Sequence, residues 1–210
     1  MKLYTFDSAP NPARLKRFMD YKGICLNNEQ IDMSKLGQHE ASYLAVVPEG
    51  TLPTLVLEDG SRLTEVIAIA HYLESIFPEK PLLGITPLEK ATILNWNHRI
   101  FNTFYIAVAE AFRNSHPAFA DRGLPGTKPY AQIPALAERG RERLSHAFED
   151  INRHLAERDF VAGSNFSFAD IDLLIALEFA GWAAKITPSE AHSAIASWQQ
   201  RAAAQLAGCR

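Results

Sequence analysis

The stretch at residues 50–57, with the sequence GTLPTLVL, constrains the fold of this chain more than any other feature. Its apolar and β-branched residues are typical of a buried strand, and Pro53 stands at the head of that strand, where a proline removes no hydrogen bond from a sheet. An Asp-Gly turn follows at residues 59–60, and a helix then begins near Glu65 and is expected to end before Pro78. The stretch therefore predicts two strands joined by a hairpin turn and followed by a helix.

The same segment offers backbone groups that can bind a ligand. The first N–H groups of a helix have no partner inside the helix, and the helix dipole favours negative charge beside them, so the helix start near Glu65 can bind a carboxylate. If the Leu52–Pro53 peptide bond is cis, the N–H and C=O groups of Leu52 turn outward. The alternative is an ordinary β-hairpin that leads into a helix and binds nothing.

Length and composition are those of a globular protein. The chain has 210 residues, of which 47% are hydrophobic, enough for one large domain or two small ones with a packed core. A net charge of -3 gives no reason to expect nucleic acid or an anionic membrane as the main partner. We find no apolar run long enough to cross a bilayer and no secretory signal, so we expect a cytoplasmic protein.

The two cysteines do not indicate a redox or metal centre. Cys25 and Cys209 lie near opposite ends of the chain and form neither a CxxC pair nor the spacing of metal ligands. We expect Cys25 to be a buried core residue and Cys209 to be a free thiol near the end of the chain. No metal site is predicted.

The N-terminal part reads as alternating strands and helices. Residues 3–6 form a short strand, and a helix should follow in which Asn11 is the N-cap, Pro12 takes the first helical position and Gly23 ends the helix. Residues 25–31 are interpreted as a second strand, parallel to the first because a helix joins them. Together with residues 50–77 the order is βαβ, a loop, then ββα.

The second part of the chain shows only helical signals. Prolines mark a connection at residues 79–87, which separates an expected domain at residues 1–78 from one at residues 88–210. Ser167 as N-cap and Asp170 three residues later form a variant of the capping box before a buried helix. We expect the second domain to contain four main helices, at residues 88–112, 136–155, 171–184 and 193–207.

The chain resembles the cytosolic glutathione S-transferase family in the order of its motifs. These are the βαβ unit, residues 50–55 (GTLPTL), residues 63–65 (LTE), the proline-marked linker and residues 167–170 (SFAD). The likeness covers essentially the whole chain and is closest to bacterial-type enzymes with a serine-like active site. It implies an α+β two-domain fold, in which an N-terminal thioredoxin-like βαβ-ββα domain is followed by an all-α helical bundle domain. It also implies a homodimer.

The resemblance assigns glutathione-binding roles to residues around Pro53. The backbone of Leu52, ahead of a cis-proline, would pair with the cysteinyl part of glutathione, and Glu65 with Val66 would hold the γ-glutamyl end. This chain departs from the family at Val66, where Ser or Thr is usual, because valine can offer only its backbone N–H. The loss of one hydrogen bond lowers affinity by about 0.5–1.5 kcal/mol.

The catalytic donor is also altered. Ala9 stands where the serine-type enzymes carry their serine, so the role of donating to the glutathione sulfur passes to Ser8 or to Asn11. We prefer Ser8, because Asn11 is expected to cap its own helix. Alternatively, both residues only shape the turn.

The residues for the glycyl end of glutathione and for the acceptor each have two possible interpretations. His39 matches the place of a donor for the glycyl end of glutathione, although a surface histidine is often inert. One apolar stripe of the long helix, with Asn97, Phe101 and Tyr105, is expected to form the acceptor pocket. Packing within a dimer or between domains explains that stripe equally well.

We therefore expect a glutathione transferase, in which glutathione is a cosubstrate and its thiolate attacks a small hydrophobic electrophile. One alternative is another glutathione-dependent reaction, such as that of an isomerase, a dehalogenase or a peroxidase. The other is a non-catalytic glutathione-transferase-like binding protein, which the absence of a hydroxyl at both Ala9 and Val66 makes plausible.

Overall fold

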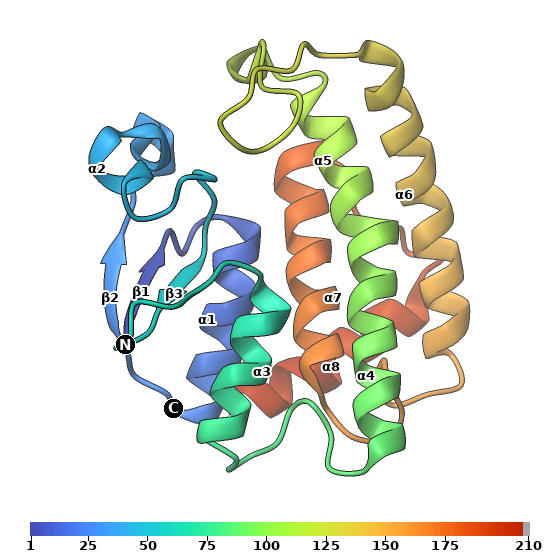
Figure 1. The fold of residues 1–210 in the computed structure, drawn as a ribbon. Helices are drawn as coiled ribbons and strands as arrows, with labels where there is room; N and C mark the ends of the chain where they lie inside the picture. The colour runs from blue at the N-terminus through green and yellow to red at the C-terminus, as the bar shows by residue number, and fades with distance from the viewer. Residues whose placement is uncertain (208–210) are drawn as a thin grey trace. The chain divides into compact units, whose positions relative to one another are not determined.

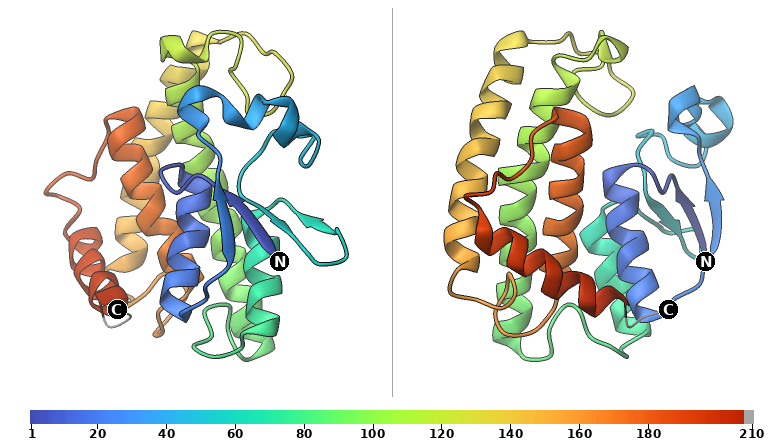
Figure 2. Two further views of the ribbon diagram at one scale, coloured as in Figure 1. Left: turned by 90° about the vertical axis from the view of Figure 1, so that its left-hand side faces the viewer. Right: turned by 180° about the vertical axis from the view of Figure 1, so that it is seen from behind.

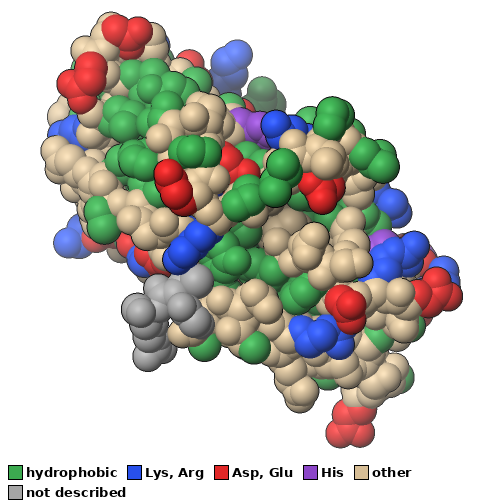
Figure 3. Space-filling view, turned by 90° about the horizontal axis from the view of Figure 1, so that it is seen from below, with side chains coloured by type: hydrophobic (Ala, Val, Ile, Leu, Met, Phe, Trp, Pro, Cys, Tyr) green, Lys and Arg blue, Asp and Glu red, His purple; other side chains and the backbone are tan. Residues whose placement is uncertain are grey.

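The computed structural model describes residues 1–207, and the chain forms two compact units. Unit 1 comprises residues 1–80 together with the short segment 125–128, and unit 2 comprises residues 81–124 and the chain from residue 129 onward. No helix among the described residues is long and apolar enough to cross a membrane. Charged side chains of both signs are interspersed with hydrophobic ones on the face that Figure 3 shows.

Unit 1 contains a four-stranded sheet in the order β2-β1-β3-β4 (Figure 1). Strand β1 pairs with β2 in parallel and with β3 in antiparallel, and β3 pairs with β4 in antiparallel. The βαβ-ββα order expected from the sequence is therefore confirmed. The elements of unit 1 are β1 (Lys2–Thr5), α1 (Pro10–Lys22), β2 (Asn27–Gln30), the 3-10 turns η1 (Met33–Lys35) and η2 (Gly37–His39), α2 (Ala41–Leu44), β3 (Thr54–Val56), β4 (Arg62–Leu63) and α3 (Val66–Ile76).

The core of unit 1 follows from strand alternation. Leu3 and Leu55 are cross-strand partners and are both buried, while helices α1 and α3 pack against each other. Tyr4 points to the opposite side of β1 from Leu3, because successive side chains alternate, and packs on a second cluster around Tyr43. The ring centroids of Tyr4 and Tyr43 lie 5.7 Å apart. The buried members of that second cluster are Tyr43, Val47 and Leu52.

Two boundaries in unit 1 differ from the sequence prediction. Helix α1 begins at Pro10 with Ala9 as its N-cap, so Asn11 is not the cap and lies inside the first turn. Pro10 and Pro12 both suit the first turn, since neither needs an N–H partner there, and the helix starts at the earlier one. Strand β2 is shorter than residues 25–31, and all four of its residues are exposed because it lies at the edge of the sheet. The predicted end of α1 at Gly23, with φ of 74°, is confirmed.

Unit 2 is helical. Its elements are α4 (Pro87–Ile100), the π-helical turn η3 (Phe101–Tyr105), α5 (Ile106–Arg113), the 3-10 turn η4 (Pro117–Phe119), α6 (Pro134–Leu155), α7 (Phe168–Phe179), the π-helical turn η5 (Ala180–Ala184) and α8 (Ser193–Ala207). The single long helix expected at residues 88–112 is thus interrupted by η3. Figures 1 and 2 show α5 and α6 side by side, in agreement with their extensive contacts.

A buried carboxylate fixes the start of α7. Asp170 is fully buried and accepts hydrogen bonds from the N–H and Oγ of Ser167, at 2.9 and 3.0 Å, which confirms the predicted capping box. Its other oxygen accepts from the Val161 N–H and from the Trp198 indole N–H. One side chain therefore joins α7, α8 and the loop before α7.

Candidate functional site

Three chain segments meet at one end of the sheet in unit 1. Tyr4 pairs with Thr54 in antiparallel, so the loop that follows β1 lies opposite the residues just before β3. Leu55 pairs with Leu63 in antiparallel, so the start of α3 after β4 lies at the same end. The predicted glutathione-binding segments around Ser8, residues 52–53 and residues 65–66 are therefore brought together by strand register alone.

The loop after β1 is held by short polar contacts. The Thr5 hydroxyl donates to the Asp7 carboxylate at 3.1 Å, the Asp7 N–H donates to the Gln30 side chain at 3.2 Å, and the Ala9 N–H donates to the Phe6 carbonyl at 2.8 Å. These contacts leave Ser8 exposed at the tip of the loop. Its hydroxyl has no hydrogen-bond partner within residues 1–207, so it is available to a ligand.

The start of α1 offers a second donor. Pro10 and Pro12 have no N–H, and the Ala13 N–H already donates to the Ala9 carbonyl, so Asn11 supplies the one unused backbone N–H of the first turn in the described chain. The Asn11 side-chain oxygen accepts from the Arg14 guanidinium at 3.0 Å, which leaves its NH₂ group pointing elsewhere. The expectation that capping occupies Asn11 is wrong, and both Ser8 and Asn11 remain candidate donors.

The Leu52–Pro53 bond is cis, as the sequence analysis expected. Tyr43 anchors the residue before Leu52, because its hydroxyl donates to the Thr51 carbonyl at 2.6 Å. Burial raises the pKa of Tyr43 to about 12, so this hydroxyl keeps its proton at neutral pH. Neither the N–H nor the C=O of Leu52 is hydrogen-bonded to another described residue, which makes both available to an extended ligand.

Residues 65–66 open helix α3. Glu65 is the N-cap and is exposed, and its side chain makes no capping hydrogen bond. Val66 takes the first helical position with a buried side chain, so only its backbone N–H can face a ligand. An uncapped helix start next to an exposed carboxylate is suited to a ligand that carries both a carboxylate and an ammonium group, since the N–H groups attract the former and Glu65 the latter.

His39 ends the 3-10 turn η2 and is partly exposed. This turn packs close to residue 50, because a Cβ atom at Gly50 would lie 3.0 Å from the Gln38 carbonyl oxygen. Gly50 also has φ of 61°, a conformation that glycine adopts without steric cost. The approach places His39 near the segment that leads to Leu52. Lys35, one turn earlier, lies 3.6 Å from the Asp32 carboxylate.

The predicted acceptor residues occupy α4 and the π-helical turn η3 of unit 2. Asn97 and Tyr105 are buried and bind α7: the Asn97 amide donates to the Asp172 carboxylate at 2.7 Å, and the Tyr105 hydroxyl donates to the Asp172 carbonyl at 2.9 Å. Phe101 is 38% exposed and stacks on Tyr105, with ring centroids 6.1 Å apart. Phe101 is therefore the member of the three that is most accessible to a ligand.

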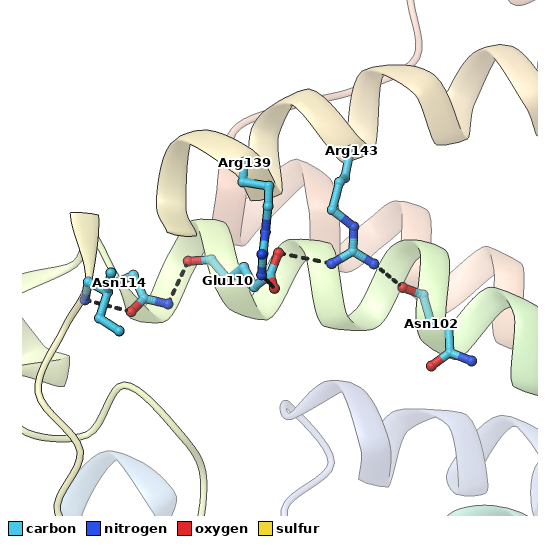
Figure 4. A network of polar contacts seen from close by, with 6 residues as sticks. Asn102, Glu110, Asn114, Arg139 and Arg143 are labelled. Carbon is cyan, nitrogen blue, oxygen red and sulfur yellow. Dashed lines mark hydrogen bonds and ion pairs between the residues drawn. The ribbon is translucent and has the colours of Figure 1, made fainter. Parts of the chain in front are cut away.

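A polar network holds η3 in place (Figure 4). Arg143 of α6 donates to the carbonyl of Asn102, which lies in the π-helical turn, and to the Glu110 carboxylate at 2.9 Å. Arg139 donates to the same carboxylate. Sequence reasoning missed this network, because its members are up to 41 residues apart.

Two of the cavities among the described residues of unit 2 have none of the predicted acceptor residues in their lining. One, of about 450 Å³, lies between the end of α6 and α8, and the other, of about 380 Å³, lies between α7, the following loop and α8. The acceptor assignment therefore depends on the exposed ring of Phe101 and its neighbours.

The prediction that Cys25 is a buried core residue is wrong. Cys25 is exposed, not buried, because it lies in the connection between α1 and the exposed edge strand β2. Cys209 lies outside the described residues. Among residues 1–207 no group of three His, Cys, Asp or Glu side chains could hold a metal ion.

Both parts of the chain match known families. Residues 3–81 match the family described as "Glutathione S-transferase, N-terminal domain", and residues 106–205 match "Glutathione S-transferase, C-terminal domain". The chain is similar to Glutathione S-transferase 2 of Saccharomyces cerevisiae, with 30% identity over 203 residues that cover 96% of this chain and 84% of that relative.

Solved structures agree. A glutathione S-transferase domain-containing protein from Marinobacter aquaeolei superposes with a TM-score of 0.87 at 28% identity, covering 97% of this chain and 98% of that one. Gtt2 from Saccharomyces cerevisiae gives a TM-score of 0.85 at 27% identity, with both chains fully covered. The chain therefore belongs to the glutathione S-transferase family.

Proposed function

We propose that this protein is a glutathione transferase. It binds glutathione in unit 1, favours the thiolate form and directs the sulfur to an electrophilic carbon of a small hydrophobic acceptor. The observation that carries this proposal is the meeting of three unused hydrogen-bonding segments at one end of the sheet: the Ser8 loop, the backbone of Leu52 and the uncapped start of α3 at Val66.

The chemistry requires a stabilised thiolate. A free thiol has a pKa near 8.5 and is mostly protonated at neutral pH. A hydroxyl or amide donor at the sulfur, from Ser8 or Asn11, and the positive end of α1 favour the anion and release the proton to solvent. The sulfur lone pair then forms a C–S bond. A leaving group departs with its electron pair, or, in an addition reaction, the acceptor takes up a proton.

The other roles follow from the kind of group that each residue offers. The backbone of Leu52, ahead of Pro53, pairs with the cysteinyl residue of glutathione. Glu65 binds the γ-glutamyl ammonium group, and the Val66 N–H binds its carboxylate. His39 donates to the glycyl carboxylate.

Unit 2 supplies the acceptor contacts in this proposal. Phe101 offers an exposed ring, while Asn97 and Tyr105 hold that part of α4 and η3 against α7. We also propose that residues 1–78, which belong to unit 1, form the glutathione-binding domain. Residues 88–210 form the domain that binds the acceptor. We also propose that the protein is a cytoplasmic homodimer. Its role in this proposal is the detoxification of electrophiles.

The experiment that tests the function combines binding with product analysis. Calorimetry should show glutathione binding, and Glu65→Gln should weaken it about tenfold, because one hydrogen bond to a charged group is lost. Glu79→Gln is the matched control, since Glu79 is exposed and follows the end of α3, whereas Glu65 stands at its start. Conjugates must then form with alkyl or aryl electrophiles. Products of isomerisation, dehalogenation or peroxide reduction alone would contradict transfer, and binding without any turnover would indicate a binding protein.

A further inference from the structure

A short piece of the loop between α5 and α6 belongs to unit 1. This piece, residues 125–128 with the sequence PGTK, is called the loop tip below. Thr127 lies beside Gly50, because a Cβ atom at Gly50 would be 3.2 Å from the Thr127 Cγ2 atom. A Cβ atom at Gly126 would likewise lie 3.8 Å from the Glu49 carbonyl oxygen. The loop tip is therefore packed on the residues that lead to Leu52.

The two ends of this loop are tied to each other. The Gly123 N–H donates to the Tyr130 carbonyl at 2.8 Å, and the Tyr130 N–H donates to the Asp121 carbonyl at 2.8 Å. Arg113 of α5 donates to the Leu124 carbonyl at 2.8 Å. These contacts restrict the loop tip, so that binding a ligand there costs little further conformational entropy.

Lys128 carries a positive charge that the described chain does not pair. The residue is exposed, and no hydrogen bond or ion pair within residues 1–207 includes its ammonium group. Glu49, whose backbone the loop tip approaches, is also exposed and forms no ion pair there. Lys35 differs, because its ammonium group lies 3.6 Å from the Asp32 carboxylate. Lys128 is therefore available to an anionic group of a ligand.

A buried amide lies next to the same place. Gln38 is 5% exposed, and its Oε1 atom has no hydrogen-bond partner among the described residues. Its carbonyl oxygen would lie 3.0 Å from a Cβ atom at Gly50, so Gln38 and Thr127 flank the same side of Gly50. Buried amide oxygens are normally bonded, because an unsatisfied one costs free energy. The peptide N–H of a ligand would satisfy this oxygen.

The order of the strands indicates which part of glutathione reaches the loop tip. Strands β2 and β4 lie at opposite edges of the sheet; η2, which contains Gln38, comes after β2, and α3 begins after β4. Leu52 lies between these two places, since it precedes β3. An extended tripeptide with its γ-glutamyl end at Val66 and its cysteinyl residue at Leu52 therefore has its glycine on the side of Gln38.

We propose that Lys128 pairs with the glycyl carboxylate of glutathione, so that the loop tip selects ligands in which this carboxylate is free. The proposal rests on the proposed function and adds a contact from a loop that follows α5. The ammonium group stands on a flexible four-carbon stem next to Thr127, which lets it reach a ligand beside Gly50. A glutathione derivative that is esterified or amidated at the glycine loses the pair.

Calorimetry with two ligands tests the proposal. The ligands are glutathione and glutathione monoethyl ester, in which the glycyl carboxylate is blocked. Lys128→Gln should bind glutathione about fivefold more weakly than the wild type, because a partly exposed ion pair is lost. The same variant should bind the ester within about twofold of the wild type. Lys128→Arg keeps the charge and should bind glutathione within about twofold of the wild type.

Lys90→Gln is the matched control. It removes an exposed lysine of α4 that also forms no ion pair among the described residues. Its affinity for both ligands should equal that of the wild type. Thermal unfolding verifies that the variants, which all change exposed positions, are folded.

The contrary results are distinct. If the wild type binds glutathione and Lys128→Gln binds it equally well, this proposal is overturned and the proposed function stands. An equal loss for glutathione and its ester in Lys128→Gln, or the same loss in Lys90→Gln, would overturn the pairing with the carboxylate. A wild type that binds no glutathione would overturn the proposed function as well.

Discussion

The indole N–H of Trp198 donates to the carboxylate of Asp170 at 2.8 Å, and both side chains are fully buried. The same carboxylate accepts from Val161 and twice from Ser167, so four donors depend on one residue. Burial raises the pKa of Asp170, while the four donors oppose that rise. The start of α7 and the position of α8 are therefore set by a single acceptor.

Replacing Asp170 by Ala should destabilise the protein by about 3 kcal/mol or more, because several buried donors lose their acceptor at once. Trp198→Phe, which removes one donor and keeps the ring, should cost about 1–2 kcal/mol. Urea unfolding of the two variants measures both values. Asp150→Ala, at an exposed position of α6, is the control. If Asp170→Ala lost no more free energy of unfolding than the control, the carboxylate would not organise α7.

Lys22 and Lys16 both pair with a carboxylate, but only Lys22 is buried. Its ammonium group donates to Glu74 at 3.1 Å and to the carbonyls of Glu79 and Lys80. Lys22→Met should therefore cost about 3 kcal/mol, because it removes a buried ammonium group that donates to one carboxylate and to two backbone carbonyls. Lys16→Met removes an exposed pair with Asp20 and should cost no more than about 0.5 kcal/mol. Chemical unfolding measures the free energy of unfolding of both variants. Equal losses of stability in Lys22→Met and Lys16→Met would contradict a structural role for the buried ammonium group.

His154 should make stability depend on pH. Burial lowers its pKa below the usual value, although its ring contacts the Val161 carbonyl at 2.8 Å, which opposes the shift. Between the folded pKa and about 6.5 the unfolded chain binds more protons at this residue, so stability rises with pH through that interval and is lost on acidification. In His154→Gln this part of the pH dependence should vanish when thermal unfolding is compared at pH 5 and pH 8. If the difference in thermal stability between pH 5 and pH 8 stayed the same in His154→Gln, His154 would not be the source of the pH dependence.

Local sequence signals predicted much of the fold. The glycine at residue 23, the proline at residue 53 and the Ser167–Asp170 pair each act through their nearest neighbours in sequence, and all three predictions are confirmed. The glutathione segments could also be predicted together, because strand order and register follow from a few short apolar runs.

Other features depend on contacts that sequence does not display. The π-helical turn η3 relies on Arg143, which is 41 residues from the carbonyl that it binds. Cys25 is exposed because β2 became an edge strand, and its residues have too little alternation to show this. The start of α1 was misplaced because two prolines, two residues apart, fit the same turn equally well. The preference for Ser8 over Asn11 rested on that error. Which of the two residues donates to the glutathione sulfur therefore has to be measured.

The most direct test of the central claim is the pKa of the glutathione thiol when bound, measured from the ultraviolet absorbance of the thiolate as the pH is raised. Because donors and the positive end of α1 favour the anion, the bound thiol of the wild type should titrate at least about one unit below the free value near 8.5. Ser8→Ala or Asn11→Ala should move that pKa back toward the free value, and the larger rise identifies the donor. A wild-type pKa equal to that of free glutathione would contradict the account.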